Sequence, residues 1–150
     1  GGRGGVDLAM AQGAAVSGAE AALEAAILDA LRSDASVASV LGDPLRVAEI
    51  GGARPAFPYL EIGRHTSELS GGANVAMSTH RVDLVCVSRD DGGVQAKTAV
   101  AAVRSALGVA GLAMAGWRCV LLVPVFTDTM RPAPGVWRAL LRLKAVVEAA

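Results

Sequence analysis

Alternation of apolar and polar positions is clearest between residues 78 and 88, where it predicts a strand. The even positions hold His80, Val82, Leu84 and Cys86, and the odd positions hold Arg81, Asp83, Val85 and Val87. A period of two with one more apolar face is typical of a half-buried antiparallel strand. An earlier strand is expected from Phe57 to Gly63. The polar segment Arg64 to Met77 between the two is predicted to be a long loop, and loops of that length are usually functional or disordered.

Apolar positions spaced three and four residues apart predict a long helix near the start of the chain. Ser17 and Glu20 form a capping box ahead of it, and it is expected to end near Arg32. Its apolar stripe consists of Leu23, Ala26, Ile27, Ala30 and Leu31. A short helix capped by Ser33-Asp34 should follow and close at Gly42, because glycine accepts the backbone conformation that ends helices.

A second long helix is expected after Asp90-Asp91, since either aspartate can serve as an N-cap. Its predicted inner face consists of Val94, Ala96, Val100, Val103 and Leu107. Gln95, Lys97 and Arg104 fall on the opposite, polar side. The sequence therefore predicts two main helices, each with one apolar face to bury.

Further strands are expected in three places. Leu45 to Ile50 predicts a short strand. Trp117 to Thr127 is apolar on both faces and is interpreted as a central strand, although Pro124 indicates an edge or a bulge. Val136 to Val147 fits both a helical stripe and a period of two. We interpret it as a strand joined to the previous one by a turn at Asp128–Gly135, because alternation places all its basic side chains on one face. Those side chains are Arg138, Arg142 and Lys144.

The predicted fold class is α+β: an antiparallel sheet of about four strands with the two main helices packed on one face. Residues 17–150 are expected to form a single domain. Residues 1–16 are rich in Gly and Ala without periodicity, and we interpret them as a flexible tail. A chain of 150 residues can bury roughly two-thirds of its unfolded surface, so a core needs no disulfides.

Composition narrows the functional classes. Hydrophobic residues make up 53% and charged residues 19% of the chain, which argues against disorder. The formal net charge is zero, which gives no support to charge-driven binding of nucleic acid. Cys86 and Cys119 both lie in apolar runs, and we interpret them as free thiols in a reducing compartment. No uninterrupted apolar run is long enough to predict a membrane span.

Catalytic chemistry finds little support in the sequence. His65 and His80 are the candidate bases. His80 shares a face with Cys86, but roughly 20 Å of strand separates the two side chains, so they cannot pair with each other. A partner for either histidine on another element stays open. No nucleophile elbow, zinc-binding helix or phosphate loop is present. We therefore predict no enzymatic activity, no cofactor and no metal.

Two groups of residues are candidates for contact with partners. The first lies in the predicted loop and consists of Arg64, His65, Glu68, Leu69, Asn74 and Val75. It could order on a partner or remain a mobile surface loop. The second is the basic face formed by Arg138, Arg142 and Lys144. It is either a solvated face or a polar interface with a neighbouring subunit or with passing nucleic acid.

The order of these segments resembles a known family, the small tail-completion proteins of long-tailed bacteriophages. These are the tail terminators, or tail-to-head joining proteins. The resemblance extends from about Ala21 to Val147 and rests on four segments together. They are the helix Ala21–Leu31 with the turn Asp34–Ala38, the strand start Phe57-Pro58-Tyr59, the run His80–Arg89, and the closing Trp137-Arg138-Ala139-Leu140.

The resemblance implies a ring-forming subunit, commonly a hexamer. The ring would cap the completed tail tube and join it to the head connector, with DNA passing through its lumen without specific binding. Implied partners are copies of the same chain, the tail tube protein and the head–tail connector. The protein would be part of the virion, at the head-proximal end of the tail, after assembly in the host cytoplasm. Phage-like gene transfer agents carry the same module. The alternative is a small-molecule-binding ferredoxin-like α+β module with a closed apolar pocket.

Overall fold

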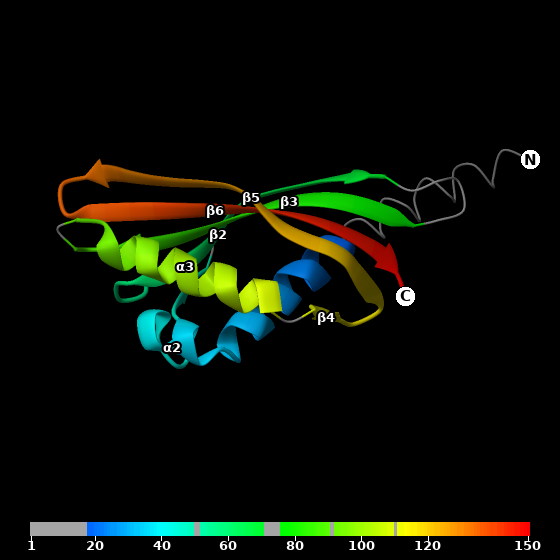
Figure 1. Ribbon diagram of the computed structural model, residues 1–150, viewed down its shortest axis with the longest axis horizontal. Coiled ribbons are helices and arrows are strands. Elements are labelled where there is room, and N and C mark those ends of the chain that lie inside the picture. The colour runs from blue at the N-terminus through cyan, green and yellow to red at the C-terminus, as the bar shows by residue number, and fades with distance from the viewer. Residues whose placement is uncertain (1–17, 50–51, 71–75, 91, 110) are drawn as a thin grey trace, which may run out of the picture.

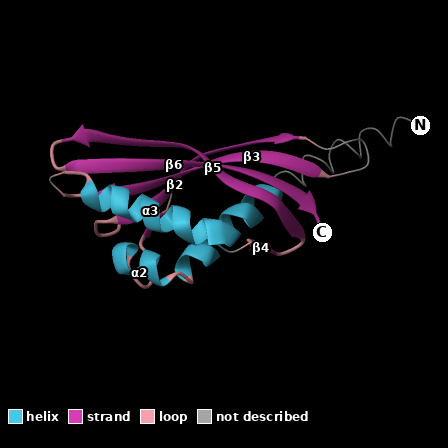
Figure 2. Cartoon of the chain, viewed as in Figure 1, coloured by secondary structure: helices cyan, strands magenta, loops and turns pink. Residues whose placement is uncertain are grey.

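The structure, a computed structural model, describes residues 18–49, 52–70, 76–90, 92–109 and 111–150. Its first helix covers residues 18–32. The elements that follow are α2 (Ala35–Leu41), β1 (Val47–Ala48), β2 (Tyr59–Leu69), β3 (Met77–Ser88), α3 (Val94–Val109), β4 (Ala113–Met114), β5 (Trp117–Ala133) and β6 (Val136–Ala149). The helices lie together on one side of a twisted sheet, which confirms the α+β class (Figures 1 and 2).

The sheet is mixed and has six strands in the order β1-β2-β3-β6-β5-β4. Its centre consists of the four long strands β2, β3, β6 and β5, which pair antiparallel as the sequence predicts. The sheet has more strands than the expected four or so, because two-residue strands flank it; the sequence predicts β1 but not β4. Of these, β1 runs parallel to β2, and β4 runs antiparallel to β5. The predicted strand Leu45–Ile50 is thus reduced to Val47–Ala48.

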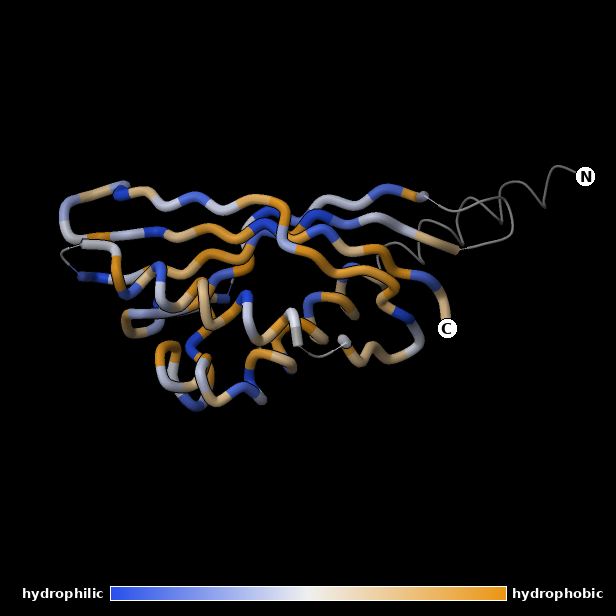
Figure 3. Tube along the Cα trace, viewed as in Figure 1, coloured by the Kyte–Doolittle hydropathy of each residue, from blue (hydrophilic) through white to orange (hydrophobic). Residues whose placement is uncertain are grey.

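The core lies between the helices and the sheet. Leu23, Ile27 and Leu31 of the first helix are fully buried there, as their spacing predicts. The strands contribute alternate residues from β3 and β6, namely Val82, Leu84, Cys86, Leu141, Leu143, Ala145 and Val147. Figure 3 shows apolar segments facing each other across this layer. The opposite face of the sheet carries only a small apolar cluster around Tyr59, Val85 and Val87.

Local sequence signals explain the helix ends. Asp34 caps α2 by accepting a hydrogen bond from the Val37 amide at 3.0 Å, and Gly42 closes the helix with a φ of 93°. Asp90 accepts hydrogen bonds from the Gly93 and Gln95 amides at the start of α3. Ser17 and Asp91, the other predicted caps, lie outside the described residues. One inner-face prediction is wrong: Val94, the first residue of α3, is 68% exposed.

The strand interpretation of the last segment is confirmed. Residues 139, 141, 143, 145 and 147 are all buried, and the alternate positions are partly exposed. Pairing with β3 across twelve residues and with β5 on the other side makes β6 a central strand.

Two loop predictions are wrong. Residues Arg64 to Leu69 are not a loop, because β2 continues through them and pairs with β3 as far as Leu69 and Ser78. The predicted turn Asp128–Gly135 is also mostly strand, since β5 extends to Ala133 and only a tight turn at Gly135 (φ 75°) leads to β6. Polar composition misled both predictions, because strands at a sheet edge tolerate polar residues on both faces.

Candidate assembly surface

Strand β5 forms most of one edge of the sheet, which corrects its interpretation as a central strand. Only Trp117 and Arg118 pair outward with β4, and from Cys119 to Ala133 no described strand lies on the outer side of β5. The backbone amides and carbonyls that point outward along this stretch therefore have no strand partner among the described residues. Such an edge is a template for pairing with another chain.

The same edge is unusually apolar for an exposed strand. In the described part of the chain, five of the seven exposed large hydrophobic residues belong to β5. They are Val120, Leu121, Val125, Phe126 and Met130, each between 40% and 53% exposed. Soluble proteins usually protect edges with charges or short strands. A cluster of apolar side chains on a bare edge marks an interaction surface.

Irregular pairing contributes to this exposure. The register between β5 and β6 shifts between Cys119 and Leu121 and again between Pro124 and Phe126. The second shift confirms that Pro124 signals a bulge, since proline cannot donate a ladder hydrogen bond. Each of these two shifts leaves one residue of β5 unpaired, Val120 at the first and Val125 at the second. A bulge of this kind turns the side chain of the extra residue away from the pleat, and both valines are about half exposed.

Ion pairs cover the sheet face that the helices leave free. Arg142 donates to both carboxylate oxygens of Asp83, at 2.8 and 3.2 Å, and its guanidinium lies 5.2 Å from the ring centroid of Phe126. The hydrogen bond with Asp83 raises the pKa of Arg142, so the guanidinium stays charged. Arg138 pairs with Glu61. Two of the three basic residues predicted as a contact face are thus paired within the subunit.

A shallow hollow of about 280 Å³ surrounds the Asp83–Arg142 pair. Arg64, Thr66 and Arg81 complete its lining. Lys144, the third residue of the predicted basic face, lies opposite Arg81 in the β3–β6 register. This face therefore carries two ion pairs together with three further cationic side chains, those of Arg64, Arg81 and Lys144.

The structure places most of the first predicted contact group on β2. Arg64, Glu68 and Leu69 are exposed strand residues, whereas Asn74 and Val75 lie outside the described residues. A register shift between Ile62 and His65 reverses the side-chain alternation of the strand. As a result, His65 turns toward the helices and its side chain is only 7% exposed.

His65 belongs to a hydrogen-bonded chain that sequence reasoning missed. Its Nδ1 lies 2.7 Å from a Glu24 carboxylate oxygen, and its Nε2 lies 2.8 Å from Nδ1 of His80. Nε2 of His80 lies 2.7 Å from the Ser78 hydroxyl. Beside this chain, the Ser67 hydroxyl donates to Glu20. These side-chain hydrogen bonds connect the first helix to β2 and β3.

Burial disfavours the protonated form of His80. His80 is fully buried, and burial lowers the pKa of His80, with a further lowering from His65 and an opposing effect of Glu20. The hydroxyl of Ser78 is as buried as the histidine, with 3% of the residue exposed. The arrangement joins a helix to a sheet, and it leaves Ser78 shielded from a substrate in solvent.

The cysteines are free thiols in the structure, as predicted. Burial raises the pKa of Cys86 to about 12, so its thiolate is strongly disfavoured at neutral pH. Burial also raises the pKa of Cys119.

The described residues contain no group of three or more His, Cys, Asp or Glu side chains that could hold a metal ion. No helix in the same part of the chain has both the length and the apolar character needed to cross a membrane.

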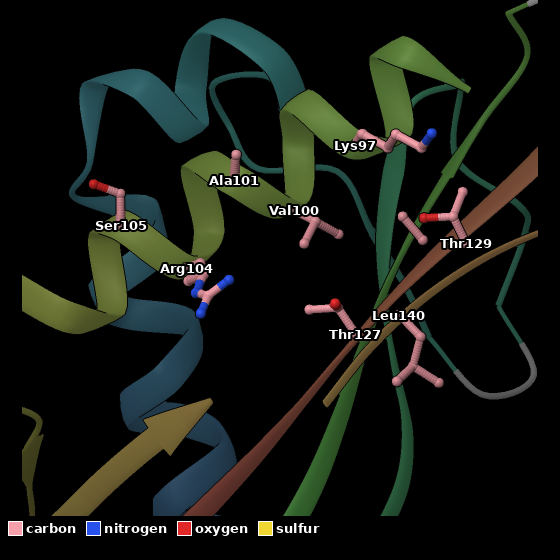
Figure 4. Close-up of a pocket in the computed structure, with 9 residues that line it drawn as sticks. Lys97, Val100, Ala101, Arg104, Ser105, Thr127, Thr129 and Leu140 are labelled. Carbon is pink, nitrogen blue, oxygen red and sulfur yellow. The ribbon is translucent and has the colours of Figure 1, made fainter. Parts of the chain in front are cut away.

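A groove of about 470 Å³ runs between α3 and the strands β5 and β6 (Figure 4). On the helix side it is lined by Lys97, Val100, Ala101, Arg104 and Ser105, and on the strand side by Thr127, Thr129, Ala139 and Leu140. Five of these nine residues are exposed, so the groove is open to solvent. A small-molecule-binding module would require a closed apolar pocket at this layer, and this groove does not provide one. It instead extends the exposed surface of the β5 edge onto the helix side.

An α+β subunit with a bare apolar sheet edge fits the class of assembly proteins, and the comparisons agree with that class. Seven chains from solved structures match the fold. One belongs to a structure described as the virion of a native gene transfer agent particle. It is 27% identical, with a TM-score of 0.78, and the match covers 87% of this chain and 97% of that one. No curated protein matches.

The family follows from the sequence match itself. Residues 25–148 match the model of a family described as "Tail completion protein gp17". The chain therefore belongs to this family of tail completion proteins and is a structural tail protein. The resemblance inferred from the sequence segments is confirmed.

Proposed function

We propose that copies of this chain form a closed ring that caps the completed tail tube and joins it to the head connector. DNA passes through the lumen of that ring, and the protein stays at the head-proximal end of the tail in the finished particle. Membership of the tail completion family and the likeness to a chain of a gene transfer agent virion support this function. A ring of six is the expected size.

The observation that carries the proposal is the bare edge of β5. A ring needs a heterologous contact, in which one surface of a subunit meets a different surface of the next and the rotation closes. A strand edge with exposed apolar side chains supplies one such surface, through backbone hydrogen bonds and burial of Val125 and Phe126. Contacts of moderate strength suffice, because a ring meets its partner ring through many copies at once.

The sheet face without helices has properties that suit a lumen. Arg138 and Arg142 are paired with Glu61 and Asp83, so this face exposes charges of both signs. Tight binding of DNA requires cationic side chains that are free to neutralise phosphates. We place Arg138, Arg142 and Lys144 on the lumen side, where the ion pairs of the two arginines weaken their attraction for passing phosphates.

The end of β2 is our proposed contact with the tail tube or a neighbouring subunit. Arg64, Glu68 and Leu69 are exposed there, and Asn74 and Val75 follow in sequence. His65 supports this contact indirectly, since its bonds to Glu24 and His80 hold the strand against the first helix.

A charge placed on the β5 edge tests the proposal. Native mass spectrometry and cryo-electron microscopy should show closed rings of the wild-type chain, either alone or on purified tail tubes. Val125→Glu should abolish the rings, because a carboxylate in an apolar contact loses its hydration. Its urea unfolding midpoint should stay near that of wild type, since Val125 is 47% exposed in the subunit.

Val94→Glu is the matched control, because Val94 is an exposed valine on α3 and is not part of the β5 strand. It should leave the rings intact. A wild-type chain that remains monomeric even with tail tubes would overturn the proposed function, as would rings that tolerate Val125→Glu as well as Val94→Glu.

A further inference from the structure

The sheet has a second bare edge, on β2. The parallel strand β1 pairs only with Leu60 and Glu61, so no described strand lies outside the stretch from Ile62 to Leu69. This stretch is about 25 Å long at the usual rise of a strand. The bare stretch of β5 is longer, from Cys119 to Ala133, so the full bare stretch of β2 can lie against it. Leu69 at the end of β2 is 51% exposed and adds an apolar side chain to this edge.

The helix side chains beside the two bare edges carry opposite charge. Near β2 lie the carboxylates of Glu20 and Glu24, placed by their bonds to Ser67 and His65, together with Glu68 in the strand itself. Arg64 is the one cationic residue in the bare stretch of β2.

The β5 edge has the reverse balance. Lys97 and Arg104 line the groove beside Thr127 and Thr129, and Arg131 lies in the strand. Asp128 is the one acidic residue in the bare stretch of β5. Complementary charge on two surfaces of one subunit favours contact between unlike surfaces and opposes contact between like ones.

Strand direction also suits contact between the two edges. Each neighbouring pair among β2, β3, β6 and β5 is antiparallel, so β5 runs opposite to β2. Rotation about an axis along the strands preserves these directions. A neighbouring copy related by such a rotation would therefore present its β2 antiparallel to β5, the more stable form of pairing.

We infer that the β5 edge of one subunit pairs with the β2 edge of the next copy of this chain, so that the sheet continues around the ring. This inference rests on the proposed ring and names the surfaces that build it. The exposed apolar residues of β5 are then covered by the neighbouring β2 and by Leu69.

Cross-linking between single cysteines tests this contact. The background carries Cys119→Ser, and Cys86 is buried with a pKa of about 12 and does not react. Thr66→Cys marks the β2 edge and Val125→Cys marks the β5 edge. Rings assembled from an equal mixture of the two chains are treated with a short flexible bismaleimide. Covalent dimers should form in the mixture, and they should not form when either variant is assembled alone.

Thr66→Cys mixed with Val94→Cys is the control and should give no dimers. Dimers from Val125→Cys alone would overturn the inference, because they place two β5 edges together. Rings that yield no cross-link in the mixture would overturn it while leaving the proposed ring in place. Absence of rings with tail tubes present would overturn both.

Discussion

At the scale of single residues, the chain from Glu24 through His65 and His80 to Ser78 shows how burial and hydrogen bonding select protonation states. His80 has no exposed surface and accepts or donates at both ring nitrogens. Protonation would put a second hydrogen-bond donor and an unhydrated charge into this space, next to His65. The fold therefore holds His80 in its neutral form.

This protonation state predicts a dependence of stability on pH. The pKa of His80 in the folded protein lies below its usual value, which the unfolded chain retains. At pH values between these two pKa values the unfolded chain binds more protons than the folded protein, so the free energy of unfolding rises with pH. Wild-type protein should lose stability as the pH falls below about 6.5 toward the folded pKa, by about 1.4 kcal/mol for each unit between the two pKa values. Urea unfolding at a series of pH values measures this slope.

His80→Gln removes the titrating group and keeps a side chain that can hydrogen-bond to His65 and Ser78. The variant should be less stable at pH 8 and should show a smaller slope in the acid range. A variant that keeps the full wild-type slope would show that His80 is not the group responsible.

Gly93 illustrates a backbone constraint at the same scale. Its φ is 72°, and a Cβ atom there would lie 2.8 Å from the ring of Trp137. Gly93→Ala should lower the free energy of unfolding by about 2 kcal/mol, because alanine is strained at this φ and meets the indole. Gly92→Ala is the matched control, since the nearest atom to its Cβ would be 3.8 Å away. Equal urea midpoints for the two variants would contradict the expectation.

At the scale of elements, the sequence predicts strand β6 well and strand β5 poorly, and the reason is physical. In β6 the basic residues Arg138, Arg142 and Lys144 all lie on one face of the strand. Only a period of two fits both these charges and the apolar positions. In β5 the apolar residues occupy both faces, a pattern that ordinarily indicates burial within one chain. Alternation alone does not reveal that the strand lies at an edge, because that depends on the order of strands in the sheet.

The part of strand β2 beyond Gly63 is wrongly predicted as a loop for a related reason. The register shift after Ile62 reverses the alternation, so Arg64 and Glu68 point to the free face while His65 and Ser67 meet the first helix. A polar run with no consistent period resembles a loop. The partners that make it a strand are Glu20 and Glu24, more than forty residues earlier. The pairs Asp83–Arg142 and Glu61–Arg138 were unpredictable in the same way, since they depend on the order of strands.

At the scale of the whole molecule, the two edges would let a subunit with zero net charge assemble directionally in the proposed ring. Net charge predicts neither attraction nor repulsion between copies, but acidic side chains beside β2 and basic side chains beside β5 give each subunit two unlike ends. Unlike ends add subunits head to tail, and the twist and curvature of the sheet then determine whether the series closes. A chain with only one functional end can join one neighbour and no more.

That property gives a prediction about subunits with one blocked edge. Val125→Glu blocks the β5 edge and Leu69→Lys blocks the β2 edge, because each puts into the apolar contact a charge of the same sign as the opposite edge. Each variant alone should be monomeric by native mass spectrometry. An equal mixture should form heterodimers, since the intact β5 edge of Leu69→Lys meets the intact β2 edge of Val125→Glu. Growth should stop there, because the two free ends of the heterodimer both carry the added charge. Trimers or rings in the mixture would show that subunits also join through other surfaces, and homodimers of either variant would show that like edges pair.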